Sequence, residues 1–385
     1  MPERRKGRRR VGLIVNPLAG IGGRVGLKGS DGTAIVERAL ALGAVPAAGA
    51  RAAETLSHLR DLADVLDLGT YPAEMGARAA CETGFEPAVM GTLGDTGSVG
   101  RTTGRTTGED TRRAALDLRE WGAELIVFAG GDGTARDVTA SVARTVPVIG
   151  IPAGVKIHSS VFAVSPRQAA DVIGEFLAGR ARLEEREVLD IDEDLFRAGI
   201  VAPRLHGYLT VPCVRDLVQR AKSASRSDPS TARGVAFGVL GEMERDRDAY
   251  FILGPGSTVK AVGDELQVDK TLLGVDLYHD GRLIGTDLNE SQLLEAIEGH
   301  RAKIVVTVIG GQGYVFGRGN QQLSPKVIQA VGRDNIIVIA TLDKLHALGG
   351  PLRVDTGDPG CDRLLEGYVR VITGERERAI WRVRS

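Results

Sequence analysis

The chain has 385 residues, which is too long for one ordinary core and predicts two domains. Hydrophobic residues make up 43% of the chain but aromatic residues only 4%, so we expect aliphatic side chains to fill its cores. The formal net charge of −1 argues against broad binding to nucleic acid, which requires a basic surface.

The start of the chain and its cysteines bear on where the protein works. Residues 1–10 (MPERRKGRRR) are interpreted as a basic tail, with contact to an anion or a membrane surface as the alternative. We expect no secretory signal, since no apolar segment follows, and no membrane span, since no run of about 18 apolar residues occurs. Cys81, Cys213 and Cys361 lie far apart, without the spacing of metal ligands or a disulfide framework. A reduced, cytoplasmic compartment and no membrane partner are therefore expected.

The N-terminal part alternates strand and helix patterns. Residues 11–15 (VGLIV) form a continuous apolar run, typical of a strand buried on both faces, and Asn16 follows it. A Gly-rich loop at residues 18–32 precedes helices predicted at residues 33–42 and 53–66. In the second helix, leucines recur at spacings of 3, 3 and 4, which places them on one helix face. A strand at residues 65–68 is the competing interpretation of the end of this helix.

The next part contains a segment of low complexity. Residues 87–90 are a short strand candidate, and residues 91–108 repeat RTTG in tandem. We interpret the repeat as a mobile surface loop, with a lid that closes over substrate as the alternative. A helix is predicted from Asp110, its N-cap, to Trp121, and Gly122 ends it.

A strand at residues 124–129 (ELIVFA) runs directly into GGDGT at residues 130–134. Further elements are predicted at residues 135–143 (helix), 147–152 (strand) and 167–177 (helix). This alternation predicts an open, mostly parallel, Rossmann-like α/β sheet in a nucleotide-binding domain over residues 11–182.

From residue 183 the pattern changes to strands without long helices between them. They are predicted at residues 186–191, 205–211, 250–253, 273–278 and 282–287. We therefore predict a β-rich substrate domain over residues 183–300, with a polar loop or frayed helix at residues 220–233. Residues 301–385 return to an α/β pattern and are predicted to pack back on the first domain. Elements there are predicted at residues 303–309, 324–331, 335–341, 368–371 and 380–383.

The GGDGT sequence carries the strongest chemical signal. In an open α/β sheet, ligands bind beyond the carboxyl ends of the strands, where glycines let backbone N–H groups approach a phosphate. Asp132 would repel a phosphate unless it binds Mg²⁺ or accepts a proton from a hydroxyl, and both roles belong to phosphoryl transfer. The alternative is that Asp132 only caps the following helix.

Two other Gly-rich segments also follow strands. LGPGST at residues 253–258 offers Ser257 and Thr258 to phosphate or sugar hydroxyls, or is an ordinary turn with helix caps. Asn16 and the AGIGG that follows bind nucleotide phosphate or form a plain connection. Neither G-x-G-x-x-G nor a Walker A sequence is present, so dehydrogenase-type binding is not supported.

Single polar residues near other strand ends are weaker candidates. Lys156, at the end of the strand that residues 147–152 form, is placed to neutralise phosphate charge, and His158 is either a pocket residue or a structural one. Arg318 and Asn320, in a Gly-rich segment, are candidates for anion or substrate contacts, with a tight surface turn as the alternative.

Together these sequences resemble the NAD kinase family, within the group of diacylglycerol kinases, sphingosine kinases and 6-phosphofructokinases that share a GGDG[TS] loop after a strand. The closer resemblance is to the ATP–NAD kinase-like branch that contains relatives of acetoin catabolism protein X. It runs through VGLIVNPLAGIGGRVGLKGSDG, EDTRRAA, FAGGDGTARDV, GIPAGVKIHSSVFA, ILGPGSTVKAV, KTLLGVDL and IGGQGYVFGRGNQQLSP, and covers most of the chain.

The resemblance implies roles for individual residues. Asp132 would contact and activate the ribose 2′-hydroxyl of NAD. LGPGST resembles the family's second Gly-rich motif, TPTGSTA, although its first residues differ. Asn289 and Glu290 have the letters of a further family motif but are predicted to open a helix, so no role is carried over. The residues implied to bind nucleotide or phosphate are Asn16, Gly130, Gly131, Gly133, Thr134, Gly154, Lys156, Gly254, Gly256, Ser257 and Thr258.

The activity implied is that of an NAD kinase, with ATP or polyphosphate as donor, NAD as acceptor and Mg²⁺ as the metal, for which no ligand residue is assigned. Alternatives are a kinase of the same fold acting on a lipid, a sugar or another nucleotide, and a non-catalytic nucleotide-binding regulatory protein. An intact GGDGT argues against the regulatory protein, and no amphipathic membrane helix supports a lipid kinase. Expected partners are small-molecule nucleotides and, by resemblance, further copies in a dimer or tetramer.

Overall fold

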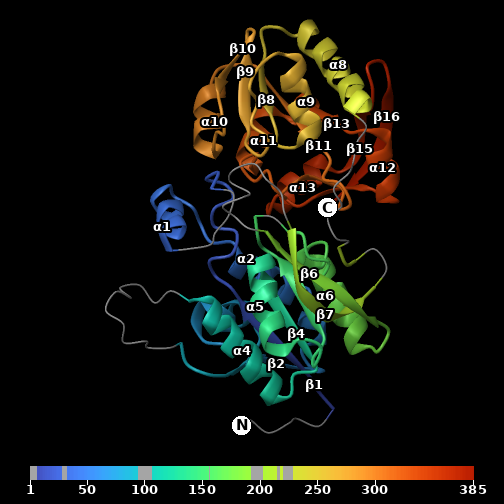
Figure 1. Ribbon diagram of the computed structural model, residues 1–385. Helices are drawn as coiled ribbons and strands as arrows, with labels where there is room; N and C mark the ends of the chain where they lie inside the picture. Colours follow the sequence, from blue (N-terminus) through green and yellow to red (C-terminus); the bar gives the residue numbers. More distant parts are fainter. Residues whose placement is uncertain are drawn as a thin grey trace. The chain divides into compact units, whose positions relative to one another are not determined.

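The computed structural model describes residues 7–27, 33–93, 106–155, 157–191, 203–214, 217–219 and 229–385. Lys156, most of the predicted loop at residues 91–108 and part of the predicted basic tail therefore lie outside the described residues. The chain forms two compact units that divide at residue 222, except that residues 22–28 and 41–44 group with the second unit (Figure 1). No helix in the described ranges is long and apolar enough to cross a membrane.

The first unit is built on a five-stranded parallel sheet in the order β3-β2-β1-β4-β5. Its strands are β1 (Arg9–Val15), β2 (Leu66–Thr70), β3 (Ala88–Val89), β4 (Leu125–Gly130) and β5 (Val148–Pro152). Every residue of β4 and β5 is buried, which explains why their sequences are continuous apolar runs instead of alternating ones. The predicted open parallel α/β sheet is confirmed.

Helices cover both faces of this sheet. α4 (Gly108–Trp121) and α5 (Asp132–Val142) pack on each other and on β4, whereas α2 (Ala48–Ser57) and α6 (Pro166–Leu177) pack together and on β5. The other helices of the unit are α1 (Thr33–Ala41) and α3 (Ala77–Glu82). Because the strands are parallel, the loop that follows each strand leaves the sheet at the same edge, formed by the carboxyl ends.

The start of α4 differs from its prediction. The helix begins at Gly108, and its N-cap is Thr107 instead of Asp110. Asp110 lies in the first turn, where its Oδ2 accepts a hydrogen bond from the Thr107 N–H at 2.7 Å. This is a capping box, in which the acidic side chain reaches back to the cap residue. The predicted end at Gly122 is confirmed, since this residue has a left-handed φ of 87°.

The helix predicted at residues 53–66 is wrong beyond Ser57, and the competing prediction of a strand at residues 65–68 is the one that the structure supports. α2 spans Ala48–Ser57, a 3₁₀ turn covers Arg60–Leu62, and β2 begins at Leu66. Leu66 and Leu68 pair with Arg9 and Val11 of β1 in the parallel sheet. Sheet pairing therefore overrides the helical spacing of the leucines, which are buried in the same core despite their different secondary structure.

A long antiparallel hairpin, β6 (Arg182–Ile191) and β7 (Pro203–Cys213), extends the first unit. It packs on α5, and β7 also contacts β5. Residues 183–221 consequently group with the first unit, which differs from the predicted domain boundary after residue 182. The change of sequence pattern at residue 183 marks this hairpin.

The second unit contains a nine-stranded sheet in the order β10-β9-β8-β11-β13-β15-β16-β14-β12, so the prediction of a second, β-rich domain is confirmed. Its strands are β8 (Tyr250–Leu253), β9 (Asp276–His279), β10 (Arg282–Gly285), β11 (Ala302–Thr307), β12 (Tyr314–Phe316), β13 (Ile336–Ile339), β14 (Leu352–Val354), β15 (Gly367–Ile372) and β16 (Arg378–Arg384). Strands from residues 302–384 share this sheet with β8–β10, so the predicted separation at residue 300 is not observed.

Helices also separate the strands of the second unit. They are α8 (Pro229–Arg245), α9 (Ser257–Glu265), α10 (Glu290–Ile297), α11 (Pro325–Val331), α12 (Leu342–Leu348) and α13 (Pro359–Leu365). α8 begins inside the stretch predicted as a polar loop or frayed helix. Alternate residues of each central strand enter two different cores: Ile304 and Val306 of β11 belong to one, and Val305 belongs to the other.

Candidate active site

The strand order of the first sheet creates a switch point. From β1 the chain moves outward to β2 and β3, and it then returns to the other side of β1 to form β4 and β5. Open α/β sheets bind ligands beyond the carboxyl ends of the two strands at which the order reverses. Asn16 directly follows β1, and the GGDGT loop, residues 130–134, follows β4. The predicted loops therefore lie at the expected edge of the sheet.

The Asp132 carboxylate is held by the segment that follows β5. Asp132 is the first residue of α5 and is 8% exposed. Its Oδ2 accepts a hydrogen bond from the backbone N–H of His158 at 2.7 Å, and its Oδ1 accepts one from the N–H of Ser159 at 3.0 Å. The N-cap of α5 is Gly131, so the view of Asp132 as a simple helix cap does not hold.

Asn16 and Thr134 join the ends of β1 and β4. The Asn16 Nδ2 donates to the Thr134 Oγ1 at 2.9 Å, and the Asn16 backbone N–H donates to the Ala129 carbonyl at 3.0 Å. The Gly130 carbonyl accepts from the Gly154 N–H at 3.1 Å, which ties in the loop after β5. The structure thus brings Asn16, Thr134 and Gly154 together around Asp132.

Close packing explains the first two glycines of the GGDGT loop. A Cβ on Gly130 would lie 2.4 Å from the Thr134 Oγ1, and a Cβ on Gly131 would lie 3.1 Å from the Gly154 Cα. A side chain at residue 130 would collide with Thr134 inside the loop, and one at residue 131 would press on the loop that follows β5. Gly133 lies within the first turn of α5.

Two residues of this site were missed or left open by the sequence. His158 is 3% exposed, and its Nδ1 lies 3.2 Å from the Asp132 Oδ2, which places it beside the carboxylate. Ser159 was not singled out, yet its hydroxyl also bonds to the Leu189 carbonyl of β6 at 2.9 Å. The available signal was the polar HSS that directly follows an apolar strand and its loop.

The second sheet has its own switch point. From β8 the chain forms β9 and β10 on one side, and it then returns to the other side for β11. The GPGST loop, residues 254–258, follows β8 and leads into α9. Gly256 is the N-cap of α9, with φ 114° and ψ 154°, a backbone conformation that is essentially confined to glycine. Its N–H donates to the Leu272 carbonyl at 2.8 Å.

A buried lysine contacts the GPGST loop. Thr258 is 1% exposed, and its Oγ1 accepts a hydrogen bond from the Nζ of Lys344 at 3.2 Å. Lys344 is itself 7% exposed and belongs to α12. Ser257, in contrast, is exposed. The sequence did not predict Lys344, because it lies 86 residues from Thr258 in the chain.

A buried ion pair stabilises the turn to which the GPGST loop bonds. Lys270 and Asp276 both have fully buried side chains, with Nζ and Oδ2 separated by 3.5 Å. The Lys270 Nζ also donates to the Gly274 carbonyl at 3.1 Å, and Asp276 accepts from the Thr271 N–H at 2.6 Å. These bonds fix the turn that carries Leu272, the partner of the Gly256 N–H. Burial lowers the pKa of Lys270 to about 8, although Asp276 opposes this shift.

The candidates near the C-terminus have structural partners. Arg318 is 3% exposed and forms an ion pair with Asp355, while the Asn320 Nδ2 donates to the Val315 carbonyl at 2.8 Å. The turn that contains them is therefore buried, which corrects the alternative of a surface turn. Both side chains therefore bond to other groups of the protein.

The carboxylates of the described residues bear on whether the site can hold a metal ion. In the described ranges, no group of three or more His, Cys, Asp or Glu side chains is arranged to hold one. Mg²⁺ is usually held by one or two carboxylates together with substrate phosphates, so a full protein cage is not required. Asp132 supplies the carboxylate of the GGDGT loop, and a carboxylate oxygen that accepts one amide retains a further lone pair. The residues present therefore fit an ion that is carried chiefly by bound phosphates.

The fold and the loops define a class of protein: a two-unit α/β protein with a Gly-rich loop at a switch point in each sheet, one of which carries a buried acid. Residues 11–181 match the family model of the ATP-NAD kinase N-terminal domain, and residues 246–383 match that of the ATP-NAD kinase C-terminal domain. The chain therefore belongs to the ATP-NAD kinase family, a family of kinases. Comparisons with curated proteins and with solved structures gave no match.

Proposed function

We propose that the protein is an NAD kinase, which transfers a phosphoryl group from ATP or polyphosphate to the ribose 2′-hydroxyl of NAD and so forms NADP. The observation that carries this proposal is the buried Asp132 carboxylate, which two backbone amides hold at the carboxyl ends of β1 and β4. Membership of the ATP-NAD kinase family supports phosphoryl transfer with nucleotide substrates.

In the proposed mechanism, Asp132 aims the attacking oxygen. The 2′-hydroxyl donates a hydrogen bond to the Asp132 carboxylate, which takes the proton late, because a loose transition state needs little early deprotonation. The N–H groups of His158 and Ser159 fix the direction of the carboxylate before substrate binds, so little reorganisation is needed during the reaction. Mg²⁺ bound to the donor would offset phosphate charge.

The remaining predicted residues would bind the substrates. Backbone N–H groups at the start of α5 point toward the loop and favour a phosphate there. Gly254, Gly256, Ser257 and Thr258 would contact nucleotide in the second unit, where Lys344 adds a cation beside Thr258. Lys156 remains a prediction from the sequence. Transfer therefore rests on Asp132 for direction and on loop amides and cations for charge.

The decisive experiment measures NADP formation by the purified chain with NAD and Mg²⁺, with ATP and polyphosphate in separate reactions. Asp132→Asn is the test variant, and Asp137→Asn is the control, because Asp137 is a buried acid of the same helix that pairs with Arg112 at 2.7 Å. Product that requires Asp132 but not Asp137 would support the proposal. Folded protein that binds nucleotide without turnover would favour a regulatory protein.

A second candidate function is a kinase of the same fold with another acceptor. One observation favours it: Asn289 is the N-cap of α10, and its side chain accepts from the Gln292 N–H at 3.0 Å. The prediction that Asn289 and Glu290 open a helix is confirmed, so the role of the further family motif is not carried over to them. Release of ADP with sugars, lipids or other nucleosides, in the absence of NADP formation, would identify this function.

A further inference from the structure

The large sheet of the second unit is open between two of its central strands. β13 and β15 pair at only two positions, Val338 with Val371 and Ile339 with Ile372. Continuing this register would oppose Ile337 to Arg370, but the ladder stops before them. Each strand is held on its far side, β13 by four pairs with β11 and β15 by six pairs with β16. The two strands therefore diverge inside the sheet, not at its edge.

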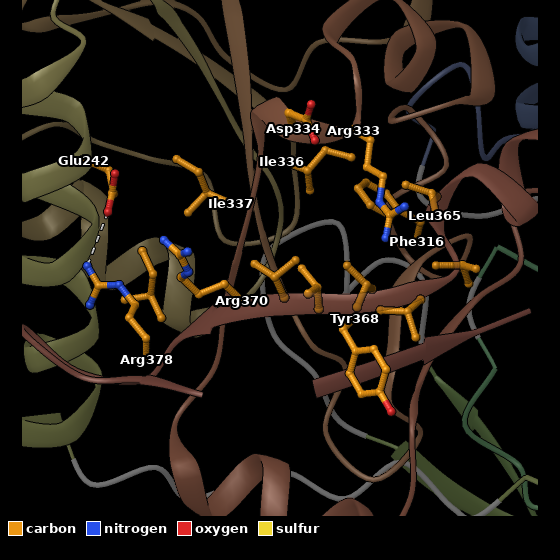
Figure 2. A pocket seen from close by; sticks show the side chains of 16 residues that line it. Glu242, Phe316, Arg333, Asp334, Ile336, Ile337, Leu365, Tyr368, Arg370 and Arg378 are labelled. Carbon is orange, nitrogen blue, oxygen red and sulfur yellow. Dashed lines mark hydrogen bonds and ion pairs between the residues drawn. The ribbon is translucent and has the colours of Figure 1, made fainter. Parts of the chain in front are cut away.

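The divergence leaves a cavity of about 370 Å³ that is partly open to solvent (Figure 2). Its apolar walls come from both cores of the unit: Val338 and Leu365 belong to one core, and Ile372 belongs to the other. The volume lies within the range of about 300–1,000 Å³ that small-molecule pockets occupy. A ligand in this cavity would bury aliphatic surface that the unfinished ladder leaves open.

Arginines supply the charge at this cavity. Arg333 and Arg370 lie on opposite sides of it in Figure 2. In the part of the chain that the structure describes, neither guanidinium forms an ion pair or a hydrogen bond. Arg378 also lines the cavity, but it pairs with Glu242 at 3.4 Å. The cavity lining thus contains three arginines and two acids, Glu242 and Asp334, and its net charge is positive.

The cavity is separate from the loops assigned to nucleotide. β8, β11, β13 and β15 run parallel, and the GPGST loop leaves the carboxyl end of β8. The ladder between β13 and β15 fails at their amino-terminal halves, at the other end of these strands. Ligands at this position are not explained by the switch point.

We propose that this cavity, which we call the β13–β15 gap, is a second ligand site for an amphipathic organic anion, an alkyl or aryl chain that ends in a carboxylate or a phosphate. The apolar body would lie between the diverging strands. Arg333 and Arg370 would hold the anionic group, because the guanidinium fork matches both head groups. The proposal does not depend on the kinase activity.

Calorimetric titration of the full chain without nucleotide tests this site. Octanoate and octyl phosphate are the probes, and 1-octanol has the same chain without the charge. We expect saturable binding of at least one anion, and binding of the alcohol that is about tenfold weaker or more. The preferred anion identifies the head group. Absence of saturable binding by both anions, or equal binding of 1-octanol, would overturn the proposal.

Variants locate the binding. Arg333→Gln and Arg370→Gln should each weaken the anion by about tenfold. Arg376→Gln is the matched control, since Arg376 is an exposed arginine between β15 and β16 that does not line the gap. Val369→Phe should fill the gap and abolish binding while the melting temperature stays the same or rises. Binding that survives Val369→Phe and both arginine variants would place the anion elsewhere and refute the assignment.

Discussion

The GGDGT loop of the first unit and the GPGST loop of the second occupy equivalent positions in their sheets, but their polar groups differ in charge. Each follows a buried parallel strand at the position where the strand order reverses, and each leads into a helix. The first holds a carboxylate, Asp132, fixed by backbone N–H groups. The second holds a hydroxyl, Thr258, fixed by the ammonium of Lys344. One architecture thus presents a carboxylate in the first unit and a hydroxyl beside a cation in the second. In the proposed function, the first would activate a hydroxyl and the second would bind an anion.

The largest expected effect tests the acidic half of this comparison. Asp132→Asn should lower turnover by roughly 10²- to 10⁴-fold, because the amide cannot take the hydroxyl proton. Circular dichroism and thermal unfolding should show that the fold is retained. Turnover near the wild-type level would remove Asp132 from the role of base.

Next in size is the backbone of the second loop. Gly256→Ala should destabilise the chain by about 1–3 kcal/mol, because its φ of 114° is strained for any other residue. The new Cβ would also lie 2.8 Å from the Thr307 Cγ2. Gly131→Ala should cost less, since its φ is −120°. Denaturant unfolding of both variants compares the loops, and Gly350→Ala, in open space and without a positive φ, is the control. Equal losses of stability in Gly256→Ala and Gly131→Ala would contradict the expected difference in backbone strain between the two loops.

The buried ion pair behind the GPGST loop predicts a pH dependence. The folded-state pKa of Lys270 is about 8, below its ordinary value of 10.5, so the unfolded chain binds more protons between these values. The free energy of unfolding should therefore rise with pH across this window, with a slope of at most about 1.4 kcal/mol per pH unit. Below pH 8 the cost of burying the ammonium is fully present.

Urea unfolding of the wild type and of Lys270→Met at pH 7.5 and 9.5 isolates this contribution, because other titrations are common to both proteins. The wild type should gain stability relative to the variant at the higher pH. Lys303→Met, which removes a partly buried pair with Asp246 at 2.8 Å, should show no such gain. Parallel behaviour of Lys270→Met and the wild type would refute the assignment.

The smallest effect concerns the cation beside Thr258. Lys344→Met should weaken nucleotide binding by about tenfold, because the proposed charged contact to phosphate would be lost. Lys326→Met is the matched control, since the Lys326 side chain is 73% exposed. Fluorescence or calorimetric titration with ATP and NAD measures the change. Unaltered affinity would contradict the proposed contact between Lys344 and nucleotide phosphate.

The sequence was sufficient where one segment carries both the strand and the loop. The apolar run that ends in GGDGT predicted β4 and the position of Asp132, and Tyr250–Leu253 was predicted with its observed bounds. The partners of these loops were not predictable. His158 and Ser159 reach Asp132 only because β5 lies beside β4, and Lys344 reaches Thr258 only through α12.

Errors in the elements have a similar cause. The leucines of residues 53–66 have helical spacing, but the pairing of Leu66 with β1 decides the outcome. The strands after residue 183 were recognised, yet only tertiary contacts show that β6 and β7 pack on α5 in the first unit. A lysine such as Lys270 is normally exposed, so its burial beside Asp276 leaves no local trace in the sequence.

The divergence of β13 and β15 also has a consequence for how the second unit opens. Two paired positions connect β10-β9-β8-β11-β13 to β15-β16-β14-β12 within the sheet. Such a seam is where cooperative units separate in partial unfolding. We expect hydrogen exchange to resolve two blocks with different opening free energies and to find weak protection of the backbone amides along the unpaired half of the seam. An amphipathic anion bound in the gap would contact both blocks, and it should raise the protection of their backbone amides together.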